Sequence, residues 1–272
     1  MTACANCGAT LVGRYCALCG QDSRAALTVR HFVAELVEGL THFDSSFWRT
    51  FLPLLFKPGE LTERYLGGKR RSYMPPVRTY LVLSIVYFLL LSAAGTQQVR
   101  SVKPNGSEFG PQDCAEFAAS VQWLRRWIPD PEAACRRAQR DEGRALANAM
   151  NGLVPKVMFL VLPLVALVQY WMYRRRRPWY VEHLVFVLHF QSFFYLAGSF
   201  ALLVVLAAPG IKGWLDLALY LWAAIYLFLA TRRVYDAGRI QAALSILVLA
   251  IAYTVFWAIG ASIAGLYAFL RA

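Results

Sequence analysis

Five long apolar stretches constrain this chain more than any other feature of its sequence. They run over about 77–95, 153–173, 181–208, 214–231 and 242–269. A helix rises about 1.5 Å per residue, so each stretch is long enough to cross a hydrocarbon core of roughly 30 Å. The sequence therefore predicts an all-α integral membrane protein with about five transmembrane helices.

The composition and charge agree with a membrane class. Hydrophobic residues make up 58% of the chain and charged residues 16%, whereas soluble domains are roughly half apolar and about a quarter charged. The formal net charge is +12. Basic residues form blocks beside the apolar stretches, near 69–71, 174–177 and 232–239, which favours anionic membrane lipids over nucleic acid as partners.

The front of the chain carries a cysteine module with the spacing C-x2-C-x8-C-x2-C. Its members are Cys4, Cys7, Cys16 and Cys19. Two such pairs favour a Cys4 zinc ribbon over the alternative, a redox-active dithiol, and Gly8 and Gly20 suit the left-handed turns that follow each pair. Four cysteines leave no open coordination position, so the expected cofactor is a structural Zn²⁺.

The sequence divides into three parts. We expect a cytosolic zinc ribbon over 1–24, then amphipathic or interfacial helices and a basic juxtamembrane motif over 25–76. The five-span membrane domain would occupy 77–272, with a periplasmic loop over 96–152.

Two helices are expected before the first span. Apolar residues recur at helical spacing over 29–43, which predicts an amphipathic helix. The stretch 47–56, FWRTFLPLLF, is too short to span a bilayer and suits an interfacial helix with Trp48 at headgroup level.

The basic blocks also predict the orientation. In a five-span chain all three blocks fall on one side, which the positive-inside rule makes cytoplasmic. Zinc thiolates require a reducing compartment and agree with a cytoplasmic N-terminus. We therefore expect a bacterial inner-membrane protein with its C-terminus in the periplasm.

Two further cysteines, Cys114 and Cys135, lie in the expected periplasmic loop. An oxidising periplasm favours a disulfide between them, which would stabilise the loop by about 3 kcal/mol. Two free thiols are the alternative.

The juxtamembrane motif combines basic and aromatic residues next to the first span. Its candidates for binding lipid or a partner are Arg64, Tyr65, Lys69, Arg70, Arg71 and Tyr73. Such a set can hold anionic headgroups. The alternative is a basic stop that only fixes topology.

The third span contains polar side chains that are rare inside membranes. They are Glu182, His183, His189 and Gln191. Such groups face a bundle interior or water. A hydrogen-bonded packing role, a solute or proton path and a metal site are the three interpretations. Glu182 and His189 stand roughly 10 Å apart on a helix, too far for one ordinary metal site.

Two further observations bear on function. Span five carries Gly260, Ala261, Ala264 and Gly265, whose spacing permits close helix packing within the chain or in a homo-oligomer. No hydrolase, phosphate-loop or dinucleotide motif occurs, so the sequence assigns no catalytic residue and favours a non-enzymatic role.

Three segments resemble, in order, a family of bacterial membrane proteins known only as a domain of unknown function with an N-terminal zinc ribbon. They are CANCGATLVGRYCALCGQ, KPGELTERYLGGKRRSYMPP and YVEHLVFVLHFQSF. The resemblance implies that the four front cysteines are ligands. It marks as motif positions of unknown role Tyr65, Gly68, Arg70, Tyr73, Pro75, Glu182, His183 and His189.

That family often has a further histidine where this chain has Gln191, which makes a histidine metal site less expected here. More loosely, the chain is similar to the five-span Yip family of membrane-trafficking proteins. We expect an adaptor or scaffold that docks a protein or anionic lipid at its cytosolic face. The alternative is a small oligomeric solute transporter or channel that uses the polar residues of span three.

Overall fold

A computed structural model describes residues 3–23, 46–93, 111–122, 130–140 and 144–271. The amphipathic helix expected over 29–43 lies outside these residues, as does much of 96–152. Contacts group the chain into two units, described separately below. The first is Met1–Ala94 with Leu162–Tyr253, and the second is Gly95–Val161 with Thr254–Ala272. The three-part division expected from the sequence stays a prediction.

Five helices are long and apolar enough to cross a membrane, which confirms the expected all-helical, five-span class. They are α4 (Pro76–Ala93), α7 (Arg144–Tyr173), α8 (Tyr180–Ala207), α9 (Lys212–Tyr235) and α10 (Arg239–Arg271). Many of their apolar side chains are exposed, as expected for helices that face lipid. A 3₁₀ turn, η2 (Pro209–Ile211), separates α8 from α9.

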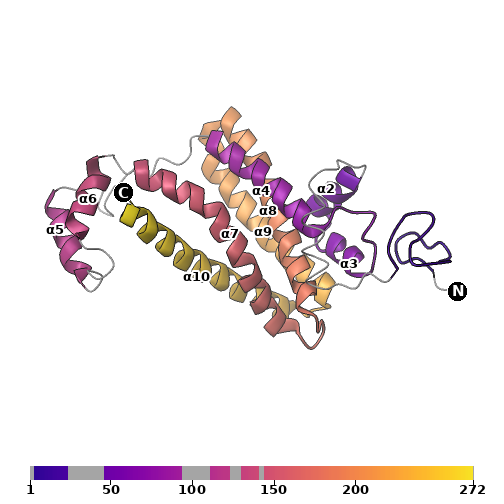
Figure 1. Cartoon of the computed structure of the whole chain (residues 1–272). Helices are drawn as coiled ribbons and strands as arrows, with labels where there is room; N and C mark the ends of the chain where they lie inside the picture. Colours follow the sequence, from indigo (N-terminus) through magenta and orange to yellow (C-terminus); the bar gives the residue numbers. More distant parts are fainter. Residues whose placement is uncertain (1–2, 24–45, 94–110, 123–129, 141–143, 272) are drawn as a thin grey trace. The chain divides into compact units, whose positions relative to one another are not determined.

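Helix α8 lies at the centre of the first unit, with α4 and α9 packed against it (Figure 1). Aromatic rings fill these contacts. Phe193 of α8 stacks on Tyr226 of α9 with ring centroids 3.8 Å apart. Between α8 and α4, the ring centroids of Tyr195 and Tyr80 lie 5.6 Å apart. Such pairs add to the packing that holds membrane helices together.

Two short helices, α2 (Ser46–Phe56) and α3 (Glu60–Leu66), precede the first span and pack on its neighbours (Figure 1). Helix α2 contacts α3 and α8, while α3 contacts both α8 and α9. One side of α2 is buried through Phe51 and Leu54, and Trp48 on the other side is exposed. This two-sided pattern suits the interfacial helix expected from the sequence.

The turn between α2 and α3 depends on Gly59. Its φ is +75°, in the left-handed region where a side chain is strained. A Cβ there would also meet the backbone of Ala230 in α9, at 3.0 Å from its Cα. Glycine therefore both makes the turn and lets α3 approach α9 closely.

The three basic blocks gather at one end of the first unit. Arg233, at the end of α9, donates to Glu63 of α3 over 2.7 Å. Arg176, in the connection between α7 and α8, donates to the carbonyl of Tyr235 over 2.7 Å. The segment that follows α3 leads directly into α4 at this same end.

The second unit contains two short helices, α5 (Pro111–Ser120) and α6 (Pro131–Arg140). A disulfide joins Cys114 of α5 to Cys135 of α6, with their Cα atoms 5.6 Å apart. Gly260 of α10 packs closely against Val157 of α7 in the same unit.

We predict that Gly59→Ala destabilises the protein by at least about 1–2 kcal/mol, because alanine is strained at positive φ and its methyl group meets α9. Thermal unfolding in detergent measures the effect. Gly238→Ala is the control, since its Cβ would meet no atom within 4 Å and its φ is not positive. Equal midpoints for the two variants would contradict the assigned role of Gly59.

Candidate functional site

The four front cysteines come from two similar turns. Antiparallel bridges pair Ala3 with Thr10 and Tyr15 with Asp22, and close one turn around each cysteine pair. Glycines end both turns in left-handed geometry, with φ +79° at the first and +71° at the second. The positions that the sequence marked for glycine thus need its conformational freedom.

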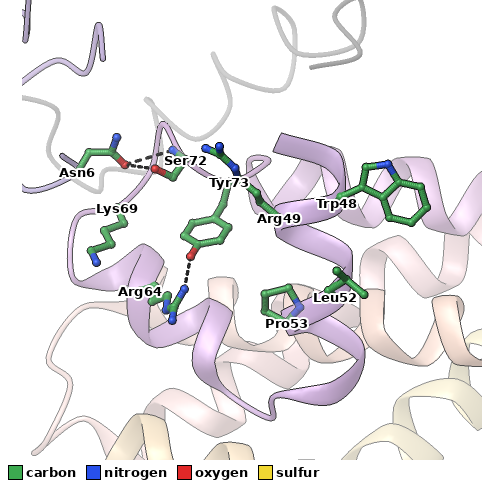
Figure 2. A pocket seen from close by; sticks show the side chains of 9 residues that line it. All are labelled: Asn6, Trp48, Arg49, Leu52, Pro53, Arg64, Lys69, Ser72 and Tyr73. Atoms are coloured by element: carbon green, nitrogen blue, oxygen red, sulfur yellow. Dashed lines mark hydrogen bonds between the residues drawn. The ribbon is translucent and has the colours of Figure 1, made fainter. Parts of the chain in front are cut away.

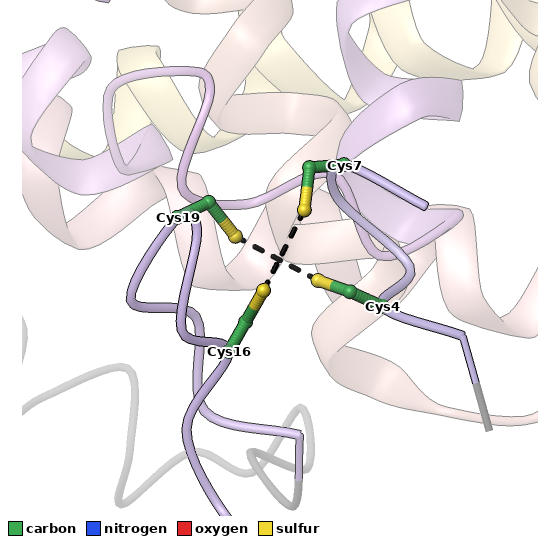
Figure 3. A group of neighbouring side chains, drawn as sticks. All are labelled: Cys4, Cys7, Cys16 and Cys19. Atoms are coloured by element: carbon green, nitrogen blue, oxygen red, sulfur yellow. Dashed lines mark hydrogen bonds between the residues drawn. The ribbon is translucent and has the colours of Figure 1, made fainter. Parts of the chain in front are cut away.

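The two turns bring the four sulfurs together (Figure 3). Cys4 Sγ lies 3.6 Å from Cys19 Sγ, and Cys7 Sγ lies 3.5 Å from Cys16 Sγ. All four sulfurs lie within 4.8 Å of one another. A tetrahedral ion with metal–sulfur bonds of about 2.3 Å would space its sulfurs by roughly 3.8 Å. The arrangement therefore fits a metal ion held by four thiolates.

Backbone amides prepare this cluster for a cation. The amides of Cys19 and Leu18 lower the pKa of Cys16 to about 6. Cys7 differs: the Ala9 amide lowers its pKa, but desolvation and the neighbouring thiols outweigh this effect and raise it to about 12. Four adjacent sulfurs resist joint ionisation, and a bound cation would remove that repulsion.

The cysteine module is attached to the loop that follows α3. Gln21 Nε2 donates to the carbonyl of Gly68 over 2.8 Å, and the amide of Arg71 donates back to Gln21 Oε1 over 3.2 Å. Asn6 Oδ1 accepts from both the amide and the hydroxyl of Ser72, at 3.2 and 2.9 Å. Residues from both cysteine turns are therefore hydrogen-bonded to the loop 68–72.

The juxtamembrane candidates separate into two groups. Arg64 donates to the Tyr73 hydroxyl over 2.6 Å, and these two residues line a cleft together with Lys69. Tyr65 is buried, and Arg70 lies over its ring at 6.0 Å. Arg71 does not line the cleft.

Helix α3 is fixed by a buried carboxylate that the sequence interpretation missed. Glu60, only 7% exposed, pairs with Arg64 at 2.6 Å and with Arg233 of α9 at 3.2 Å. Lys57 adds a longer contact of 3.6 Å. A carboxylate buried this far requires such partners, because taking a charge out of water is costly.

His189 of span three finds its partner in α3. Its Nδ1 lies 2.9 Å from Thr62 Oγ1, and both side chains are buried. The ring also stands edge-on to Tyr65, with centroids 6.1 Å apart. This contact could not be predicted from local sequence pattern, because Thr62 lies outside every predicted span.

His183 is held separately, at the end of the bundle. Its Nε2 donates to the carbonyl of Arg177 over 3.0 Å, and its Nδ1 lies 3.0 Å from the Tyr235 hydroxyl. The two rings are stacked, with an angle of 9° between their planes. Glu182 pairs with Arg177 at 3.2 Å. These contacts tie α8 to the end of α9.

The four polar residues of span three do not converge on one site. Gln191 accepts from the Tyr253 hydroxyl of α10 over 3.3 Å, whereas the histidines bond to other residues. Within the described part of the chain, the front cysteines alone form a cluster suited to metal. The separation agrees with the sequence argument against one site for Glu182 and His189.

Comparison with known proteins identifies only a segment. The model of a family described as "Protein of unknown function (DUF3667)" matches residues 44–88, which contain α2, α3 and most of α4. Comparison with curated proteins and with solved structures gave no match. The resemblance to a bacterial ribbon-bearing family and to the Yip family therefore stays an expectation.

We predict about one equivalent of metal per chain in the purified protein, lost in Cys16→Ser, because four thiolates form one closed site. Elemental analysis of the detergent-solubilised protein measures it. A chain beginning at residue 25 is the second sample and should hold no metal. One equivalent of metal still bound to the truncated chain would contradict the assignment and would indicate a metal site near His183 or His189.

We predict that Thr62→Val costs about 1–2 kcal/mol, because it leaves buried His189 Nδ1 without its partner. Thr62→Ser keeps the hydroxyl and is the matched control. Combined with His189→Leu, the valine variant should cost clearly less than the sum of the single changes, with a coupling of about 1 kcal/mol. Additive costs in unfolding measurements would show that the hydrogen bond does not stabilise the fold.

Proposed function

We propose that this protein is a membrane-embedded adaptor or scaffold whose N-terminal ribbon docks a protein partner and whose basic juxtamembrane segment, residues 64–73, contacts anionic lipid. One observation carries the proposal. The cysteine module is hydrogen-bonded to the loop after α3 through Asn6 and Gln21, yet two of its apolar side chains stay exposed. Val12 is 95% exposed and Leu18 81% exposed.

Exposed apolar tips on an immobilised module suit a docking surface. Binding of a partner over exposed apolar side chains is favourable, because it removes apolar surface from water. Tyr15, another exposed side chain of the module, can add both ring area and a hydroxyl at such a contact. Because the ribbon is already held in place, a partner need not order it on binding.

The proposed ion of the ribbon is Zn²⁺. Four thiolates in a tetrahedral arrangement suit zinc better than the harder cations, which prefer oxygen ligands. With all four positions filled by sulfur, the ion would be structural. A module of this size has little apolar core, so the metal would supply the stability that its own packing does not.

We place the ribbon in the bacterial cytoplasm, with the N-terminus inside and the C-terminus in the periplasm. Three basic blocks gather at the ribbon end of the first unit, as the positive-inside rule favours. The redox chemistry supports the same orientation. Four free cysteines precede the first span, whereas Cys114 and Cys135 are bonded and follow it.

A small oligomeric transporter or channel is the second candidate function. One observation favours this function. His189 Nε2 is buried and has no hydrogen-bond partner among the residues described. A passing solute or proton could use such an atom. The other contacts of the span-three residues support a packing role, so we rank this function second.

The adaptor proposal predicts a discrete protein adduct when a photo-crosslinking amino acid replaces Leu18 in the membrane of living cells. The ribbon variant Val12→Ser with the probe at Leu18 should give a much weaker adduct, because less apolar area is covered. A probe at Ile85, an exposed apolar residue of α4, is the control for non-specific capture.

Adducts of equal pattern at Leu18 and Ile85 would contradict the proposal. A Leu18 adduct that is unchanged by Val12→Ser would also contradict it, since the tips would then not form the docking surface.

A further inference from the structure

A cleft of about 490 Å³ opens where the ribbon, α2 and the loop after α3 meet (Figure 2). Its lining consists of Asn6, Trp48, Arg49, Leu52, Pro53, Arg64, Lys69, Ser72 and Tyr73. Residues from three separate parts of the sequence thus form one concave surface. The ribbon supplies Asn6, whose bonds to Ser72 hold that wall in place.

The cleft is strongly positive. Three of its lining residues are cationic and none is acidic. Arg64 is partly neutralised by Glu60, 2.6 Å away. Arg49 and Lys69 have no ion pair with any carboxylate that the structure describes. An anion entering the cleft would therefore meet two cations that lack a carboxylate partner among the described residues. It would also meet the Tyr73 hydroxyl, which accepts from Arg64 and can still donate.

The other wall of the cleft is apolar and belongs to an interfacial helix. Trp48 is 68% exposed and Leu52 55% exposed, and both lie on the exposed side of α2. Figure 2 shows Trp48, Leu52 and Pro53 together along α2, beside the basic residues. Tryptophan and leucine on such a helix enter the boundary between headgroups and acyl chains.

We propose that this cleft binds the phosphate of an anionic phospholipid. The basic side chains of the cleft bind the phosphate, while the apolar wall of α2 lies beside the glycerol and the start of the acyl chains. A free anion would use the basic half of the cleft and leave the apolar half without an occupant. The inference rests on the proposed function, and it gives that function's lipid partner a chemical class and a site.

The site differs from the set expected from sequence. Tyr65, Arg70 and Arg71 are absent from its lining, whereas Arg49 of α2 and Asn6 of the ribbon belong to it. The ribbon therefore contributes directly to lipid recognition in this proposal.

Isothermal titration of the full chain in a neutral detergent tests the proposal, with dihexanoyl phosphatidylglycerol as the probe. We expect Arg49→Gln with Lys69→Gln to weaken binding about 30-fold, and Lys69→Gln alone about fivefold. Arg174→Gln with Arg175→Gln is the matched control. It removes the same charge from another basic block and should change binding by less than about twofold.

The source of the phosphate is tested in parallel with dihexanoyl phosphatidylcholine and inorganic phosphate. Both should bind clearly more weakly than the phosphatidylglycerol, because one lacks net charge and the other lacks the apolar part. Unfolding midpoints equal to that of the unsubstituted chain establish that the variants are folded.

Three results would overturn the proposal. They are equal weakening by the pocket and control variants, equal binding of phosphatidylcholine, and binding of inorganic phosphate as tight as that of the lipid. None of these depends on a protein docked at Leu18. A failure of this inference is therefore distinguishable from a failure of the adaptor proposal.

Discussion

The ion pair between Glu60 and Arg233 is the interaction on which the ribbon end of the molecule depends. It joins a short helix that does not span the membrane to the end of α9, beside the close contact that Gly59 makes with the same helix. With α3 fixed, the loop after it has a defined path and the ribbon has a surface to bind. Arg233 is partly exposed and Glu60 also pairs with Arg64, so we expect removing Arg233 to cost less than the roughly 3–5 kcal/mol typical of a fully buried pair.

Membrane burial explains why the polar residues of α8 have partners from so many elements. An unsatisfied polar group in hydrocarbon costs several kcal/mol, so each side chain needs a neighbour that can bond to it. His189 finds that neighbour in α3, His183 in α9 and in the connection before α8, and Gln191 in α10. Residues that suggest a transport path from sequence alone therefore also serve as connectors between helices.

The sequence was sufficient to predict what depends on local pattern. Apolar length identified the five long helices, and cysteine spacing identified a four-sulfur cluster, because both properties are encoded by neighbouring residues. The long-range contacts were beyond such reasoning. Thr62 and His189 are 127 positions apart, and nothing near either residue specifies the other. The cleft was missed for the same reason, since Asn6 and Arg49 meet the basic loop only in the folded chain.

Gln21 of the ribbon holds the loop after α3 through three hydrogen bonds. It bonds to the carbonyl of Gly68 and to the amides of Arg70 and Arg71, all of them main-chain groups. The bonds of Gln21 thus follow the main-chain path of the loop and do not depend on the side chains of residues 69–71. Side chains matter at the two ends of this segment, where Asn6 accepts from the Ser72 hydroxyl and a Cβ at Gly68 would meet Ala5 at 2.8 Å. Related chains can alter the charge of residues 69–71 over evolution without loosening the ribbon. A single inserted residue, in contrast, would displace all three groups and separate the two parts.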